Sequence, residues 1–214
     1  MDLSRRNGRF LRLLRLPGFR LLFLSTSASS FGTLLATVAL AVDVKDRTDS
    51  GLWVGALMIV EFLPVILIGL AFGPLLDRAS RRTLMVTADV VRAAVFCALP
   101  FANSAGTIVA LAAVVGLANG FFRPAAYAGV PNLVPEEDLA HANSLIQGVE
   151  NVSWTFAPVL GGLLTAAAGP HLSYWINAAT FVISALLIAR IPRHLLQSAE
   201  ALVEFLQSLV AFPR

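Results

Sequence analysis

Five ionisable side chains stand inside long apolar runs of the sequence: Glu61, Asp89, Arg92, Arg123 and Glu150. A charge at membrane depth is costly, so such residues pair with one another or carry ions and protons. Asp89 and Arg92 are three residues apart and lie on one face of a helix, where a structural ion pair is the alternative to a functional role. Glu61 has no basic residue near it in its own run. It is therefore the candidate to carry a proton or bind a cation.

The remaining charges suggest a network. At a rise of about 1.5 Å per residue, Asp89, Arg123 and Glu150 lie at similar depth, and we predict that they form one network. Asn119 and Asn151 stand in the same runs as Arg123 and Glu150. Each of them either contacts a ligand or hydrogen-bonds a neighbouring helix.

The sequence contains no arrangement typical of an enzyme. It lacks a Ser/His/Asp set, a phosphate-binding glycine loop and a His/Cys metal cluster. Its histidines are scattered at positions 141, 171 and 194, and its one cysteine, Cys97, stands in an apolar run as a small buried hydrophobe. We therefore expect no enzyme activity, no cofactor and no metal.

The composition is that of a membrane protein. Of the 214 residues, 57% are hydrophobic and 14% are charged, with a mean hydropathy of +0.76. Soluble domains carry about 25% charged residues. The net charge is +3, and all but one of the 16 basic residues are arginine, in short clusters between the apolar runs. That distribution is typical of membrane anchors, so we expect a lipid bilayer rather than a nucleic acid as the partner.

Six runs are long enough to cross a bilayer as helices, which takes about 20 residues. Their predicted bounds are Phe19–Val42, Leu52–Leu76, Thr83–Phe101, Thr107–Val130, Ser144–Ala168 and Leu172–Ile191. The chain is thus predicted to be an all-α integral membrane protein. We divide it into a basic cytoplasmic N-terminal segment (1–18), a six-helix transmembrane bundle (19–191) and a cytoplasmic amphipathic connector (192–214).

The connections between the runs alternate in charge. Arginines precede the first run, separate the second from the third and follow the sixth, whereas Lys45 and Arg47 on the other side are offset by Asp43, Asp46 and Asp49. The positive-inside rule then places both termini in the cytoplasm. The acidic loop of residues 131–142 is also inside, a mild conflict because acidic residues contribute little to the rule. We predict a multi-pass protein of the inner or plasma membrane.

One connection carries a motif, Gly-Pro-Leu-Leu-Asp-Arg-Ala-Ser-Arg-Arg, between the second and third runs. Its informative residues are Gly73, Leu75, Asp77, Arg78, Arg81 and Arg82. Asp77 ends a helix beside a basic cluster, where charge pairs can form and break and so bias which of two packings a bundle prefers. A plain basic anchor is the alternative, but it needs only arginines and does not explain the order of the motif.

This stretch resembles the signature loop of the major facilitator superfamily, Gly-x-Leu-x-Asp-Arg-x-x-Arg-Arg. Residues 121–125, 133–144 and 177–185 resemble the macrolide and siderophore exporter branch of that family. The resemblance covers nearly the whole chain in order. It implies the N-terminal half of a twelve-helix fold, with six helices as a three-plus-three inverted repeat. It also implies that the loop is a conformational latch against the C-terminal half.

The fifth run contains a second motif with Pro158, Gly161 and Gly162. Proline kinks a helix and glycines let another helix pack closely, so an ordinary kinked packing helix is one interpretation. The stretch is also similar to the Gly-Pro-x-x-Gly-Gly motif of antiporters in the family, with Ala157 in place of the first glycine, and this implies export. Pro64 in the second run echoes Pro158, as expected for equivalent helices of an inverted repeat.

The resemblance implies secondary active transport, namely proton-coupled efflux of a drug-like or hydrophobic small molecule. This chain would supply only the N-terminal half, so we expect a second six-helix half as partner, or self-pairing. The alternative is a non-transporting membrane interaction subunit or a truncated remnant of a transporter. A second six-helix segment encoded directly downstream would decide between them.

Overall fold

The computed structural model of the chain describes residues 10–71 and 80–196, which are almost entirely helical and include no strand. Six long helices account for most of them: α2 (Pro17–Thr48), α3 (Gly51–Ala71), α5 (Arg81–Ala98), α6 (Ala105–Gly129), α7 (Leu139–Ala168) and α8 (Pro170–Ala189). Single-turn 3₁₀ helices complete the connections: η1 (Leu99–Phe101), η2 (Val130–Asn132), η3 (Glu136–Asp138) and η4 (Arg193–Leu196). Each of the six predicted runs thus coincides with a long helix, and the sixth extends two residues past the end of α8 at Ala189.

The helices begin where the sequence supplies a start signal. Proline is the first residue of both α2 and α8, a position where its missing N–H is not needed. Ser80 and Ser104 cap α5 and α6 by accepting hydrogen bonds from Thr83 N (3.4 Å) and Thr107 N (3.2 Å). α2 ends at Thr48, later than the predicted Val42, because the charged residues that follow Val42 continue the helix.

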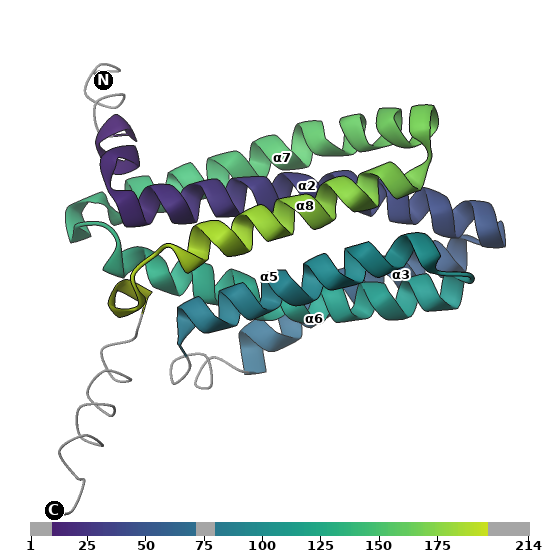
Figure 1. Cartoon of the computed structure of the whole chain (residues 1–214), viewed down its shortest axis with the longest axis horizontal. Helices are drawn as coiled ribbons and strands as arrows, with labels where there is room; N and C mark the ends of the chain where they lie inside the picture. Colours follow the sequence, from purple (N-terminus) through teal and green to yellow (C-terminus); the bar gives the residue numbers. More distant parts are fainter. Residues whose placement is uncertain (1–9, 72–79, 197–214) are drawn as a thin grey trace, which may run out of the picture.

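Five of these helical segments are long and apolar enough to cross a bilayer: Pro17–Thr48, Gly51–Leu70, Arg81–Phe101, Ala105–Asn132 and Pro170–Ala189. α7 is not one of them, because polar side chains interrupt its apolar residues, but it runs beside α2 along the bundle (Figure 1). Its membrane crossing therefore stays a prediction. The prediction that Cys97 is buried is wrong, since its side chain is exposed on the apolar surface of α5.

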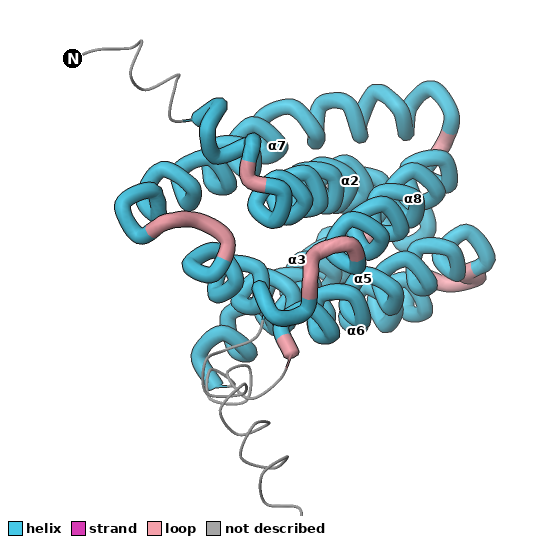
Figure 2. The backbone as a smooth tube through the Cα atoms, turned by 60° about the vertical axis from the view of Figure 1, so that its left-hand side comes forward, coloured by secondary structure: helices cyan, strands magenta, loops and turns pink. Residues whose placement is uncertain are grey.

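The helices pack as an open series rather than a closed ring. The main neighbour pairs are α7 with α2, α2 with α8, α8 with α5, α5 with α6, and α6 with α3. Figures 1 and 2 show the resulting two groups, α2, α7 and α8 on one side and α3, α5 and α6 on the other. α3 and α7 therefore form the two ends of the series.

This arrangement has the symmetry expected of an inverted repeat. If α2, α3 and α5 are exchanged for α6, α7 and α8 in order, the pair α2–α7 becomes α6–α3, and α2–α8 becomes α6–α5. The pair α5–α8 becomes itself. Pro64 and Pro158 lie inside α3 and α7, which are equivalent helices in this exchange. The neighbour pattern thus agrees with a three-plus-three repeat.

A glycine lies in each of the two equivalent contacts. A Cβ added to Gly161 of α7 would lie 2.3 Å from the carbonyl oxygen of Leu35 in α2, and one added to Gly116 of α6 would lie 2.1 Å from that of Val60 in α3. Only a residue without a Cβ permits such an approach. Gly162 differs, because its added Cβ would meet nothing closer than Val38 Cγ1 at 3.9 Å.

Candidate functional site

A cavity of about 240 Å³ lies between α2, α3, α5, α6 and α7. Apolar and aromatic side chains such as Leu34, Val65 and Ile66 form much of its wall. Each of the five helices also contributes at least one polar side chain, and Arg92 is the one lining residue from α5. A mostly apolar cavity with a few polar groups is the usual form of a small-molecule site. Four of the five predicted ionisable residues line it: Glu61, Arg92, Arg123 and Glu150.

One wall of the cavity is a row of hydroxyl groups on α2 that the sequence analysis missed: Thr26, Ser29, Ser30, Thr33 and Thr37. Their spacing of three and four residues places them on one face of the helix. Ser29 and Thr33 donate to carbonyl oxygens of their own helix at 3.3 and 2.7 Å, whereas the buried Thr26 hydroxyl has no hydrogen bond within the described residues. The helical period of these hydroxyls in an apolar run was the signal that would have found them.

Glu61 is the most isolated charge in the cavity. The residue is 7% exposed, and the hydroxyl of Thr37 on α2 is its hydrogen-bond partner. Its second carboxylate oxygen, Oε2, has no hydrogen-bond partner among the described residues. The structure therefore places at this position a buried carboxylate with no basic partner in the described part of the chain. The sequence had indicated only that its own helix supplies no basic residue nearby.

Arg123 and Glu150 form an ion pair between α6 and α7. Arg123 Nη2 donates to Glu150 Oε2 at 2.9 Å, and the Tyr127 hydroxyl donates to the same oxygen at 3.0 Å. The Glu150 side chain is mostly buried, whereas that of Arg123 is 47% exposed. The pair connects two helices that are otherwise not main neighbours.

Asp89 and Arg92 form a second, fully buried cluster. Arg92 donates to Asp89 Oδ1 and, at 2.7 Å, to Asn119 Oδ1 of α6, while Ser184 of α8 donates to Asp89 Oδ2 at 2.7 Å. The Arg92 guanidinium also lies between the rings of Phe122 and Phe181, 4.2 and 4.4 Å from their centroids. Each charge is thus paired and hydrogen-bonded, the condition under which buried charges are tolerated.

The predicted single network of Asp89, Arg123 and Glu150 is wrong in its connections. Within residues 10–71 and 80–196, Asp89 contacts its own helix and α8, whereas Arg123 and Glu150 contact each other. Similar depth did not bring them together because their side chains point in different directions around their helix axes. Of the two asparagines, Asn119 bonds Arg92 and lines the cavity, while Asn151 is exposed.

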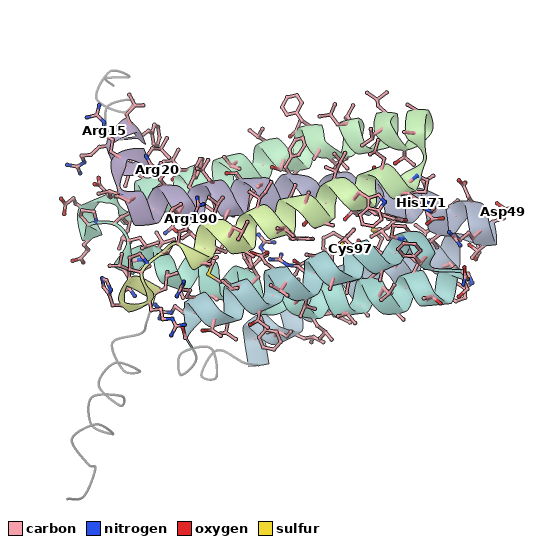
Figure 3. All side chains as sticks on the ribbon, viewed as in Figure 1. Arg15, Arg20, Asp49, Cys97, His171 and Arg190 are labelled. Atoms are coloured by element: carbon pink, nitrogen blue, oxygen red, sulfur yellow. The ribbon has the colours of Figure 1, made fainter. Side chains whose placement is uncertain are left out.

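The two ends of the bundle differ in charge. Figure 3 shows Arg15, Arg20 and Arg190 at one end and Asp49 and His171 at the other. At the second end, Lys45 pairs with Asp49 at 2.6 Å and Arg47 with Asp43 at 2.6 Å, so the acidic residues offset the basic ones there.

Asp43 at this end also holds helices together. It accepts a hydrogen bond from the Tyr174 hydroxyl of α8 at 2.9 Å, and Arg47 donates to the carbonyl oxygen of Ala102 at 3.0 Å. These contacts join α2 to α8 and to the turn before α6.

Comparison with known proteins identifies this architecture. The family model described as Major Facilitator Superfamily matches residues 21–211, which is most of the chain. The chain belongs to the major facilitator superfamily. It is therefore a multi-pass membrane protein of a transporter family, in agreement with its apolar helices and the symmetry of their packing.

Several relatives within the superfamily are similar over about four fifths of this chain. An uncharacterized MFS-type transporter, YfiS of Bacillus subtilis, is 32% identical over 177 residues, which cover 82% of this chain and 42% of the relative. The multidrug efflux pump Tap of Mycolicibacterium fortuitum is 28% identical (81% and 44% covered), and macrolide efflux protein A of Streptococcus pyogenes is 26% identical (82% and 45% covered). The matched region spans less than half the length of each of these relatives.

The loop that resembles the superfamily signature is described by the structure only at its end. Gly73, Leu75, Asp77 and Arg78 lie outside the described residues, whereas Arg81 and Arg82 form the start of α5. Arg81 donates to the carbonyl oxygen of Ala128 near the end of α6 at 2.8 Å, and Arg82 donates to that of Ala189, the last residue of α8. Basic groups at helix C-termini satisfy unpaired carbonyls and the helix dipole. These two arginines thus hold the ends of three helices together.

The described residues contain no group of three or more His, Cys, Asp and Glu side chains placed to hold a metal ion.

Proposed function

We propose that this chain supplies one half of a secondary transporter that exports a drug-like or hydrophobic small molecule in exchange for protons. The observation that carries the proposal is the cavity between α2, α3, α5, α6 and α7 with the unpaired carboxylate of Glu61 in its wall. Membership of the superfamily supports transport, and the printed names of two relatives, a multidrug efflux pump and a macrolide efflux protein, favour export.

Glu61 is the proposed proton carrier. A charged carboxylate taken out of water costs free energy, and uptake of a proton removes that cost. Access of water or of a cation stabilises the charged form again, so it favours release of the proton. Thr37 supplies one hydrogen bond, and the buried Oε2 has no hydrogen-bond partner among the described residues. Two ion pairs, Asp89 with Arg92 and Arg123 with Glu150, are proposed to couple the protonation of Glu61 to the packing of the helices. The first pair is hydrogen-bonded from α5 to α6 and α8, and the second joins α6 to α7.

A second half is part of the proposal. Alternating access needs two bundles that rock around a central site, and the matched region covers less than half of each relative described above. The partner is a C-terminal six-helix half or a second copy of this bundle. The helices α3 and α7 expose an apolar surface that lipid or the second half of the transporter would cover. Its side chains include Ile59, Ile66, Val152 and Val159.

The signature loop is proposed to be the latch between the halves. Arg81 and Arg82 are committed to carbonyl oxygens of their own bundle, so the charge that reaches the second half is assigned to Asp77 and Arg78. Asp77→Asn is then expected to cripple transport without removing the carrier from the membrane, because insertion does not depend on this charge.

The test is proton-driven efflux in inverted membrane vesicles. The carrier, as a single polypeptide or reassembled from two halves, should export a lipophilic dye in a manner that collapses with the pH gradient. Glu61→Gln should abolish this transport, and Glu137→Gln, which neutralises an exposed loop carboxylate, should not. Gradient-dependent efflux by a well-expressed Glu61→Gln carrier would show that the proton is carried elsewhere.

A further inference from the structure

We propose that the exposed faces of α2 and α8, at the end of the bundle that carries Arg15, Arg20 and Arg190 (Figure 3), bind an anionic phospholipid. The arginines there pair with its headgroup, and its acyl chains lie on an exposed apolar stripe of α8. This inference does not depend on the transport function proposed above. It follows from three features: arginines without protein partners, an apolar stripe that ends at one of them, and segments free of carboxylates.

Four exposed arginines at this end have no side-chain hydrogen bond or ion pair among the described residues: Arg15, Arg20, Arg190 and Arg193. The other basic side chains that the structure describes are committed to protein groups. Those that pair with carboxylates are Arg12, Lys45, Arg47, Arg92 and Arg123, and those that donate to carbonyl oxygens of helix ends are Arg81 and Arg82. The uncommitted positive charge of the described residues is therefore concentrated at the start of α2 and the end of α8.

These two segments lie side by side. A Cβ added to Gly18 of α2 would lie 3.7 Å from Leu195 Cδ1, just beyond the end of α8. Phe19 of α2 is buried in the same apolar cluster as Ile188 and Ile191. Figures 1 and 2 show the two helices adjacent at this end. Arginines from both helices therefore border one region of the surface.

An exposed stripe of α8 leads to Arg190. Its members recur every three or four residues and so share one face of the helix: Trp175, Ala179, Val182, Leu186 and Arg190. Val182 and Leu186 are 48% and 58% exposed, whereas Phe181 and Ile188 on the opposite face are fully buried. In a bilayer this stripe contacts acyl chains, and its last residue lies where the chains meet their headgroup. Arginine can lay its stem along apolar surface and keep its charged end at that level.

The start of α2 repeats this order in reverse. Arg20 lies near the end of the helix, and Leu24, four residues later on the same face, is 45% exposed. An apolar side chain thus lies on the membrane side of this arginine as well. One lipid molecule can present its phosphate to the arginines and its chains to the apolar residues of both helices.

The charges around this surface favour an anionic headgroup over a zwitterionic one. Residues 15–24 and 186–196 contain no aspartate or glutamate. The exposed Glu136 and Glu137 belong to η3, in the neighbouring connection between α6 and α7, and form no ion pair within the described residues. The positive group of a zwitterionic headgroup would therefore meet only unpaired guanidinium groups here. The planar guanidinium also matches the geometry of a phosphate, which it can bind through two parallel hydrogen bonds.

Native mass spectrometry of the 214-residue chain tests the proposal. The protein is released from neutral detergent that contains equal amounts of phosphatidylglycerol and phosphatidylcholine with the same acyl chains. We expect bound phosphatidylglycerol to predominate. Arg20→Gln or Arg190→Gln should weaken its binding about fivefold, the usual effect of one basic residue near an anionic headgroup, and the double variant about thirtyfold. Binding of phosphatidylcholine should not change.

Lys45→Gln is the matched control, because it removes one positive charge, as each single variant does, from a side chain that already pairs with Asp49 at the opposite end. It should leave the preference for phosphatidylglycerol intact. Thermal unfolding in phosphatidylcholine nanodiscs checks the fold of the double variant. Its midpoint should equal that of the wild type, since the side chains of Arg20 and Arg190 have no protein partners among the described residues. Phosphatidylglycerol in the nanodisc should raise the midpoint of the wild type alone.

A soluble competitor separates a lipid from a free phosphate. Glycerol 3-phosphate in large excess should not displace phosphatidylglycerol, because it lacks the acyl chains that the stripe of α8 contacts. Four results would each overturn the proposal: equal binding of the two lipids by the wild type, an unchanged preference in the double variant, an equal loss of preference in Lys45→Gln, or displacement by glycerol 3-phosphate. The first two would reduce these arginines to solvated anchors, the third would indicate general attraction to a basic protein, and the last would assign the surface to soluble phosphates.

Discussion

Gly161 of α7 packs directly on the backbone of Leu35 in α2, so closely that a Cβ on the glycine would lie 2.3 Å from the Leu35 carbonyl oxygen. The contact joins the two repeats of the bundle, and Gly116 makes its symmetry-related counterpart against Val60 of α3. α2 and α7 both contribute walls to the cavity. The spacing of these two helices therefore sets the width of the candidate site.

Gly161→Ala is expected to destabilise the bundle by about 1–3 kcal/mol, the usual cost of inserting a methyl group into a packed contact. Gly162→Ala is the matched control, because its Cβ would meet only Val38 Cγ1 at 3.9 Å and alanine favours a helix over glycine. Thermal unfolding in detergent, followed by circular dichroism, measures both. Equal midpoints for the two variants would show that the close contact does not limit stability.

The buried pair of Asp89 and Arg92 gives a second prediction about stability. Asp89→Leu should be strongly destabilising, by about 3–5 kcal/mol, because it leaves the Arg92 charge buried without a partner. The double variant Asp89→Leu/Arg92→Met removes both charges and should recover most of that loss. A double variant as unstable as the single one would mean that the contacts of Arg92 with Asn119, Phe122 and Phe181 matter more than the pairing of its charge.

The helices and their order could be predicted from the sequence because length and hydropathy decide them locally. The rotation of each helix about its axis could not, because both the lipid-facing and the protein-facing sides of a membrane helix are apolar. This is why the ion pair of Asp89 with Arg92, three residues apart in one helix, could be named as one of two alternatives. The network predicted for Arg123 and Glu150, by contrast, wrongly included Asp89. The same reason left Gly161 and Gly162 indistinguishable before their surroundings were known.

The orientation in the membrane is predicted from the arginine asymmetry, with the end that carries Arg15, Arg20 and Arg190 in the cytoplasm (Figure 3). Asp46→Cys and Glu137→Cys introduce exposed thiols at opposite ends of the bundle, in a Cys97→Ala background that removes the exposed native thiol. An impermeant thiol reagent should label position 46 in intact cells and position 137 only after the cells are opened. The reverse pattern would invert the assigned topology.

The last prediction is that this bundle does not transport as a monomer. Its helices form an open series whose ends, α3 and α7, are not main neighbours, although the rings of Phe62 and Trp154 stack between them. A single bundle of this kind exposes the polar wall of its cavity to lipid, where an unsatisfied group costs several kcal/mol, and it has no second bundle against which to rock. We therefore expect no efflux from an efflux-deficient strain that expresses the 214-residue chain alone, and recovery when a C-terminal six-helix half is coexpressed. Dye accumulation and the size of cross-linked species are measured together. Efflux by a cross-linked dimer would identify a second copy as the partner, whereas efflux by a species that cross-links only as a monomer would refute the requirement for a second half.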